Sequence, residues 1–348
     1  MPASPLAARS RARRHSMITA SAAVAAAASA LLVLAGCASS APGADGGGAT
    51  SEATGAAASG DPLAIDNCGT EVTFEQAPER VVTIKSSTLE LMLALGLEDR
   101  IVGAAFTDGP VPEEYADAAS GVDILSDRVP SQEATLAAEP DLVFAGWESN
   151  LTAEGAGDRA TLEQLGVHTY VAPAACQGED YRPDPLTFDG VFAGFEEVGA
   201  IFGVEDAAAD LVAEQRAALD AIEPSDAGLT ALWYSSGDDQ PFVGAGIGAP
   251  QMIMDAAGLE NVVGDVRDSW TSLSWEAVVD ANPDVIVLVD AAWNTAESKI
   301  AKLEANAATA AMPAVQQGRY VIVDFPATEA GVRNVDAVAS IVEQLEGL

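Results

Sequence analysis

Aromatic and polar side chains follow several short apolar runs of this sequence. Lys85 follows RVVTI, Trp147 follows LVFAG, and Trp233 lies near the end of TALWY. Short apolar runs of this kind are typical of buried strands, and open α/β sheets bind small ligands beyond the carboxyl ends of their strands. The sequence therefore predicts a ligand cleft, with candidate contacts at Lys85, Ser86, Ser87, Phe106, Trp147, Trp233, Tyr234, Trp270, Trp293 and Arg333.

The types of these residues favour a flat, conjugated ligand that carries acidic groups. Aromatic side chains provide faces on which a ring can stack. Lys85 and Arg333 are the preferred partners for a carboxylate or phosphate, whereas Lys299 is expected on an outer helix. Two alternatives stay open. At least one of the tryptophans is expected to lie in the hydrophobic core, and Lys85 and Arg333 are each as compatible with a solvated surface position as with a ligand contact.

No catalytic or metal-binding pattern stands out in the sequence. The chain has two histidines, and His168 lies in the strand-like run VHTYV without a nucleophile nearby. The carboxylates lack the spacing of a calcium-binding loop. We therefore expect no catalytic residue, no bound metal and no cofactor. A membrane-tethered hydrolase is the distant alternative.

A glycine-rich segment, GAGIGA at 244–249, fits the pattern of a dinucleotide-binding turn. No strand ending in an acidic residue follows it at the required distance, so that interpretation is weak. We interpret the segment as a turn before a helix at 251–257. The N-terminus of such a helix can line a cleft and receive an anion.

Composition bounds the class of protein. The 348 residues are 49% hydrophobic, which is enough for two lobes with sizeable cores. The formal net charge is -37, which opposes binding to nucleic acid.

The N-terminal segment has the features of a secretory signal peptide. Four arginines between residues 9 and 14 precede an apolar stretch at 17–34. The stretch ends in Leu-Ala-Gly-Cys37, which resembles the lipobox of bacterial lipoproteins, in which the cysteine is lipidated. Removal of 1–36 takes away four arginines and changes the net charge from -37 to -41. A transmembrane anchor is the less favoured alternative, and the paired arginines leave Sec and twin-arginine export both open.

The sequence divides into a signal peptide, a tether and a folded part. Residues 37–60 are rich in Ala, Gly, Ser and Thr, which predicts a flexible tether. Cys68 and Cys176 remain beyond it, and an exported chain is expected to oxidise such a pair rather than to keep two buried thiols. The bridge would close a loop worth about 4 to 5 kcal/mol in the chain-entropy model.

Strands and helices alternate in two regions. Strands are expected at 80–84, 101–105, 142–145 and 167–171, and again at 230–234, 285–289 and 320–323. The spacing Ser87 to Glu90 predicts a capping box for a helix that reaches 97. Residues 189–223 show only a helical period, with a long helix at 204–223. We therefore predict an N-terminal α/β lobe at 61–188, a helical linker at 189–223, and a C-terminal α/β lobe at 224–348.

The two lobes share a sequence pattern. Glu133 lies seven residues before Pro140-Asp141, and Glu276 lies seven residues before Pro283-Asp284; each pair precedes an apolar strand. This pattern favours a duplicated element over chance recurrence.

The chain resembles the helical-backbone substrate-binding proteins of ABC importers for iron-siderophores, haem and corrinoids, from about 61 to 348. The resemblance rests on APERVVTIKSSTLELMLALGLEDRIVGAA, QEATLAAEPDLVFAG, LGV, FGVEDAAADLVAEQRAALDAIEP, MIMDAAGLENV and SWEAVVDANPDVIVL. It implies two Rossmann-like lobes joined by one rigid helix, with the ligand in the cleft between them, as in class III binding proteins. It also implies that Glu133 and Glu276 dock onto arginines of the permease, and that a lipid-anchored monomer delivers its ligand outside the cytoplasm to a permease and its ATPase.

A finer resemblance concerns the ligand. The segments VTIKSST, FAGWESN, YVAPAAC, ALWYSSG, VGAGIGAPQMIMDAAGL, LVDAAWNTA and FPATEAGVRNVDAV are similar to an actinobacterial subgroup proposed to import the unglutamylated 8-hydroxy-5-deazaflavin coenzyme. That molecule has a planar tricyclic ring, a phosphodiester and a carboxylate. A ferric siderophore, haem or corrinoid is the alternative.

Overall fold

The computed structural model describes residues 62–182 and 184–348. The predicted signal peptide at 1–36, the lipidation site Cys37 and the tether at 37–60 lie outside these residues. Within the described ranges, no helix has the length and apolar character needed to cross a membrane.

The N-terminal lobe contains a parallel sheet of five strands, in the order β5-β4-β3-β6-β7. Its central strands are buried along their whole length, as expected for strands covered on both faces. A hairpin of β1 and β2 precedes the sheet. The elements are β1 (Leu63–Asn67), β2 (Thr70–Phe74), β3 (Val81–Ile84), α1 (Ser86–Ala94), β4 (Ile101–Ala105), α2 (Ala116–Ala119), β5 (Ile124–Ser126), α3 (Gln132–Ala137), β6 (Leu142–Ala145), α4 (Arg159–Gln164) and β7 (His168–Val171).

The C-terminal lobe contains a mixed sheet in the order β11-β9-β8-β12-β13, with β10 also paired to β8. Strands β8, β12 and β13 are parallel, whereas β9 and β11 are antiparallel to their neighbours. The prediction of two α/β lobes is therefore confirmed. The elements are β8 (Leu229–Ser236), β9 (Phe242–Gly244), α7 (Ala249–Ala256), β10 (Leu259–Asn261), β11 (Trp270–Ser272), α8 (Trp275–Ala281), β12 (Val285–Asp290), α9 (Ala296–Ala305), α10 (Pro313–Gln316), β13 (Tyr320–Asp324) and α11 (Asn334–Glu346).

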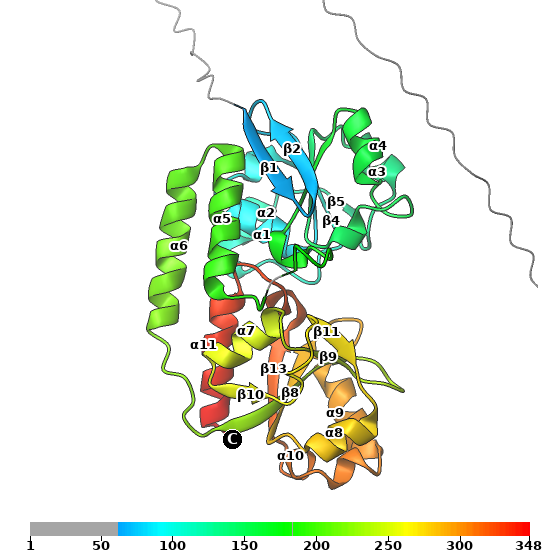
Figure 1. Ribbon diagram of the computed structural model, residues 1–348, viewed down its shortest axis with the longest axis vertical. Coiled ribbons are helices and arrows are strands. Elements are labelled where there is room, and N and C mark those ends of the chain that lie inside the picture. The colour runs from blue at the N-terminus through cyan, green and yellow to red at the C-terminus, as the bar shows by residue number, and fades with distance from the viewer. Residues whose placement is uncertain (1–61, 183) are drawn as a thin grey trace, which may run out of the picture. The chain divides into compact units, whose positions relative to one another are not determined.

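The predicted helical linker between the lobes consists of two helices that meet at Gly203. α5 (Phe188–Phe202) and α6 (Glu205–Asp220) lie side by side on one flank (Figure 1), connected through Gly203 in the left-handed conformation (φ 68°). A Cβ on Gly199 would lie 2.5 Å from the Cβ of Ala208, so glycine at 199 lets the helices approach closely. The helix expected at 204–223 thus begins at Glu205, ends at Asp220, and packs against α5.

One buried apolar cluster runs through both lobes. It includes Phe144 of the N-terminal sheet, Phe195 of α5, Trp233 of β8 and Ile341 of α11. Because the lobes share this core, their separation would expose apolar surface to water. Each square ångström exposed costs about 25 cal/mol of free energy. The shared core favours small relative motion of the lobes.

The repeated sequence pattern forms the same local structure in each lobe. Ser131 and Ser274 are the N-caps of α3 and α8, and each hydroxyl accepts a hydrogen bond from the amide three residues later. Glu133 and Glu276 lie in the first turn of these helices and are exposed. The residue before each proline has a positive φ, and each aspartate then accepts hydrogen bonds from the neighbouring segment: Asp141 from the amides of Glu79 and Arg80, and Asp284 from the amide and hydroxyl of Thr230.

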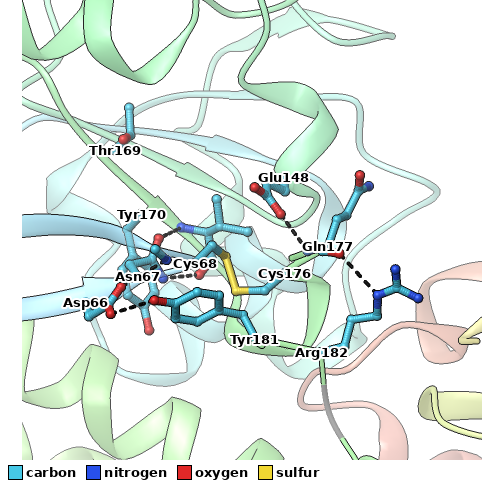
Figure 2. Close-up of a disulfide and its surroundings, with 12 residues drawn as sticks. Asp66, Asn67, Cys68, Glu148, Thr169, Tyr170, Cys176, Gln177, Tyr181 and Arg182 are labelled. Atoms are coloured by element: carbon cyan, nitrogen blue, oxygen red, sulfur yellow. Dashed lines mark hydrogen bonds between the residues drawn. A yellow bond between two sulfur atoms is a disulfide. The ribbon is translucent and has the colours of Figure 1, made fainter. Parts of the chain in front are cut away.

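The predicted disulfide is confirmed. Cys68 follows β1 and Cys176 follows β7, and their Cα atoms are 5.2 Å apart across the bridge. The side chain of Asn67 bonds both backbone groups of Val171 at 2.8 Å, so β1 is fixed to β7 beside the bridge (Figure 2). The bridge closes a long loop from the hairpin to the end of the N-terminal sheet.

The predicted capping box is wrong. Lys85, not Ser87, is the N-cap of α1, and it has no side-chain capping bond. Ser87 lies inside the helix and is buried, and Glu90 is paired with Arg333 of the other lobe. The Ser87–Glu90 spacing therefore does not indicate a cap. The carboxylate of Glu90 instead accepts a hydrogen bond from Arg333, 243 residues further along the chain.

Candidate ligand-binding cleft

A cavity of about 720 Å³ is lined by residues of both lobes. Its walls are largely aromatic and small polar side chains, which is the usual composition of a site for a small organic ligand. The aromatic residues are Trp147 of the N-terminal lobe and Phe242, Trp270, Trp293 and Phe325 of the C-terminal lobe.

The aromatic rings form two groups around the cavity. Trp270 stacks on Phe242, with ring centroids 5.7 Å apart and an angle of 15° between the planes. Trp293 and Phe325 form a T-shaped pair, with ring centroids 5.7 Å apart and an angle of 71° between the planes. The side of Trp293 that Phe325 does not cover is open, since 62% of this residue is exposed. Open aromatic faces of this kind suit a flat ring.

Four of the predicted contacts line the cavity together: Ser87, Trp147, Trp270 and Trp293. Trp233 and Tyr234 do not, because both are fully buried in β8. β8 is an interior strand of its sheet, so side chains on both of its faces are covered. The apolar run TALWY signals such a strand, and these two residues therefore belong to the core rather than to the cleft.

Lys85 is enclosed behind the cavity wall and does not line the cavity. Its Nζ lies 2.6 Å from Oδ1 of Asp108 and 3.4 Å from Oε1 of Glu329, and the side chain has no exposed surface. The rings of Trp147, Phe106 and Phe325 surround the ammonium, with centroids 3.8, 4.3 and 4.9 Å away. Two other predicted contacts also lie around Lys85 and do not line the cavity: Phe106 and Ser86. The hydroxyl of Ser86 accepts a hydrogen bond from the amide of Asp108.

Arg333 is likewise neutralised at the contact between the lobes. Its Nε and Nη2 donate to the two carboxylate oxygens of Glu90, at 2.8 and 2.5 Å, and Nη2 also donates to the carbonyl of Pro110. Two of the guanidinium nitrogens therefore donate to residues of the N-terminal lobe. Contrary to expectation, the structure does not place Lys85 and Arg333 in the cavity lining. Both residues instead contact carboxylates of the opposite lobe.

Lys299 is also buried, contrary to the expectation of an outer position. Its Nζ donates to the carbonyls of Val289 and Asn294, at 2.6 and 2.5 Å. Burial lowers the pKa of Lys299 to about 8. The contacts fix the segment that carries Trp293.

Sequence reasoning missed Glu329 and Arg182, which line the cavity, whereas the expectation that the helix start after the Gly-rich segment lines the cleft agrees with Gly248 and Ala249 in the lining. The Gly-rich segment gave a signal for the helix start. Arg182 and Glu329 gave none, because they lie in irregular segments among many other charged residues. Among the described residues, no cluster of three or more potential metal ligands occurs.

The carboxyl group of Glu329 titrates far above its ordinary range. Burial raises its pKa from 4.5 to about 7, and the nearby Lys85 ammonium only partly opposes this shift. Asp108 adds to the rise because two carboxylates share one ammonium. The junction therefore favours a protonated Glu329 below about pH 7.

Replacing Glu329 by glutamine should change how stability depends on pH. Between about pH 4.5 and 7 the folded wild type binds more protons at this carboxyl than the unfolded chain, so its free energy of unfolding falls as pH rises. Glu329→Gln removes this titration. The melting temperature of the variant relative to wild type should therefore rise across that window and level off above it. A difference that stays constant from pH 4 to 8 would show that Glu329 does not titrate in this way.

Comparisons with known proteins agree with the two-lobe cleft. The model of the periplasmic binding protein family matches residues 81–327. A cobalamin-binding protein of Halobacterium salinarum is 31% identical over 237 residues, which is 64% of this chain; the chain spans 57% of that relative's length. The substrate-binding lipoprotein YvrC of Bacillus subtilis is 24% identical over 82% of this chain and 85% of its own.

Solved structures agree as well. The structure of an ABC-type Fe3+-hydroxamate transport system from Saccharomonospora viridis superimposes with a TM-score of 0.70 at 27% identity, covering 82% of this chain and 99% of the other. The family match extends across both lobes and includes most of the segments that line the cavity. This chain belongs to the periplasmic binding protein family.

Proposed function

We propose that the protein is a lipid-anchored substrate-binding component of an ABC importer, which captures a small molecule outside the cytoplasm. The observation that carries the proposal is the cavity between the lobes, with Trp147 on one side and Trp270 and Trp293 on the other. A cavity with aromatic and small polar walls suits the binding of a small organic ligand. A monomer anchored through Cys37 would deliver its cargo to a permease and its ATPase.

The names of related proteins support this proposal. One relative is a cobalamin-binding protein, another is an ABC transporter substrate-binding lipoprotein, and a structural neighbour belongs to an Fe3+-hydroxamate transport system. These proteins bind different cargoes on one architecture, so the architecture supports the class of transport and leaves the cargo to the side chains of the cleft.

The proposed cargo is a planar conjugated molecule, and the unglutamylated 8-hydroxy-5-deazaflavin coenzyme is our first candidate. Its tricyclic ring suits a cavity lined by Trp270 and Trp293. A corrinoid, haem or ferric siderophore is the second candidate, supported by the names of the relatives. Calorimetry with the deazaflavin coenzyme and with cyanocobalamin separates the two.

Glu133 and Glu276 are the proposed docking residues for the permease. Their support is the repeated local structure, because each is exposed in the first turn of a helix with the same serine cap. A pair of equivalent carboxylates, one on each lobe, suits a partner with two equivalent basic sites.

Truncation of the cleft tryptophans tests the binding site. Trp270→Ala and Trp293→Ala should each weaken the cargo that binds by about 5- to 30-fold, since each removes an aromatic face worth on the order of 1 to 2 kcal/mol. Trp275→Ala is the matched control, because Trp275 packs on Tyr234 and does not line the cavity. Calorimetry that gives the same affinity for wild type and both cleft variants would place the site elsewhere.

Charge reversal at the docking residues tests the partner. Glu133→Arg combined with Glu276→Arg should abolish uptake of labelled cargo by whole cells, because like charges would meet the permease arginines. Ligand affinity and melting temperature should change little, since both side chains are exposed. Glu139 and Glu260, also exposed, provide a double charge-reversal control. Normal uptake by the Glu133/Glu276 variant would contradict the docking assignment.

A further inference from the structure

Arg182 is the one basic side chain that lines the cavity among the residues the structure describes. The other cations near the cleft, Lys85 and Arg333, are paired with carboxylates of the protein. Within the described ranges, no carboxylate lies within ion-pair distance of Arg182. Its position therefore differs from theirs, because Arg182 is exposed, lines the cavity and has no carboxylate partner among the described residues.

A network around the disulfide holds Arg182 in place (Figure 2). Its Nε donates to the carbonyl of Gln177 at 3.1 Å, and its backbone amide donates to the carbonyl of Gly178 at 3.0 Å. The amide of Gln177, next to Cys176, donates in turn to Oε2 of Glu148 at 2.6 Å. One guanidinium nitrogen thus fixes the orientation, while Nη1 and Nη2 stay available for a planar or tetrahedral oxyanion.

The hairpin strengthens this anchor. Tyr181, directly before Arg182, donates its hydroxyl to Oδ2 of Asp66 at 2.8 Å. Asp66 lies two residues before Cys68, so the disulfide and the tyrosine tie the same segment to the end of β1. The segment at 176–182 has no regular secondary structure beyond a short turn, and these cross-links supply its order.

The side of the cavity beyond Arg182 favours an anion as well. The amide of Leu186 donates to the carbonyl of Ile247 at 2.9 Å, which joins the chain near Arg182 to the start of α7. Gly248 and Ala249, at the N-terminus of that helix, line the same cavity and contribute positive potential. Asp268 is the opposing charge on this wall, and its carboxylate accepts a bond from the amide of Ser269.

We propose that Arg182 binds an oxyanion of the cargo, a phosphate or carboxylate, and that the Cys68–Cys176 disulfide positions the segment that presents it. The inference rests on the proposed function and adds the residue that recognises the acidic group of the ligand. A net charge of -37 repels an anion at a distance, so recognition must come from short contacts inside the cleft. Arg182 supplies such contacts, with two donor nitrogens beside a helix N-terminus.

The test uses probe pairs that share a ring and differ in a side chain that contains the phosphate. Cyanocobalamin carries a phosphodiester and dicyanocobinamide does not; the deazaflavin coenzyme and its phosphate-free ribityl precursor form the second pair. Arg182→Ala should weaken the phosphate-bearing member of the pair that binds by about 10- to 100-fold and the other member by less than about 2-fold, as measured by calorimetry. Equal losses for both members, or no loss, would overturn the proposal.

Arg267→Ala is the matched control. Arg267 is exposed, pairs with Asp184 at 2.8 Å, and does not line the cavity. This variant should bind both members of each pair like the wild type. A loss as large as that of Arg182→Ala would show a general effect of charge and would contradict a specific contact.

The role of the disulfide is tested by a double variant, Cys68→Ser with Cys176→Ser. It should lose affinity for the phosphate-bearing probe to an extent similar to Arg182→Ala, and adding Arg182→Ala to it should cause little further loss. The phosphate-free probe should bind as before, which also shows that the variant folds. Fully additive losses, or unchanged affinity in the double cysteine variant, would overturn the positioning role.

Failure of the proposed cargo is distinguishable from failure of the anion site. If the wild type binds none of the four probes, the proposed cargo classes are wrong. The anion site is then tested separately, by measuring the melting temperature with and without pyrophosphate. Pyrophosphate should raise the melting temperature of wild type and Arg267→Ala and leave Arg182→Ala unchanged. The same response in all three proteins would overturn the anion site.

Discussion

The buried contact of Lys85 with Asp108 and Glu329 determines how the two lobes of this protein are held. Lys85 and Asp108 belong to the N-terminal lobe and Glu329 to the C-terminal lobe, and the ammonium is fully buried among three aromatic rings. Separation of the lobes would remove Glu329 and the ring of Phe325 from the ammonium, whereas the pair with Asp108 would stay within the N-terminal lobe. The Arg333–Glu90 pair adds a second tie across the same junction.

This junction also explains unusual local geometry. Lys85 has φ 91° and ψ 153°, a region that is essentially restricted to glycine and costs on the order of 1 to 3 kcal/mol. A Cβ on Gly146 would lie 2.7 Å from the Cβ of Lys85, so only glycine at 146 leaves room for the buried side chain. The surrounding structure holds Lys85 in this conformation because the ion pairs and rings fix its side chain. Trp147, which follows Gly146, is thereby fixed as one wall of the cavity.

The regular elements of the fold are predictable from local pattern, whereas the chemistry of the cleft is not. The runs that become β4 and β6 were expected at their observed bounds, since buried parallel strands are continuous apolar segments. The short antiparallel strands β9 and β11 carry no such signal. The Lys85 contact joins residues 244 positions apart, and no local pattern indicates that Glu329 meets Lys85 rather than solvent. The strand end at β8 does reach the cavity, but through Ser235 and Ser236, whereas Trp233 lies two residues earlier inside the covered strand.

The central claim is that the cavity between the lobes holds one small molecule in the native host. Native mass spectrometry of the protein purified from its own host, without added ligand, tests this claim. The account predicts a one-to-one adduct in the mass range of a small organic molecule, lost when Trp270 and Trp293 are both replaced by alanine. An adduct that persists in that double variant, or a wild-type protein that carries no adduct, would contradict the claim.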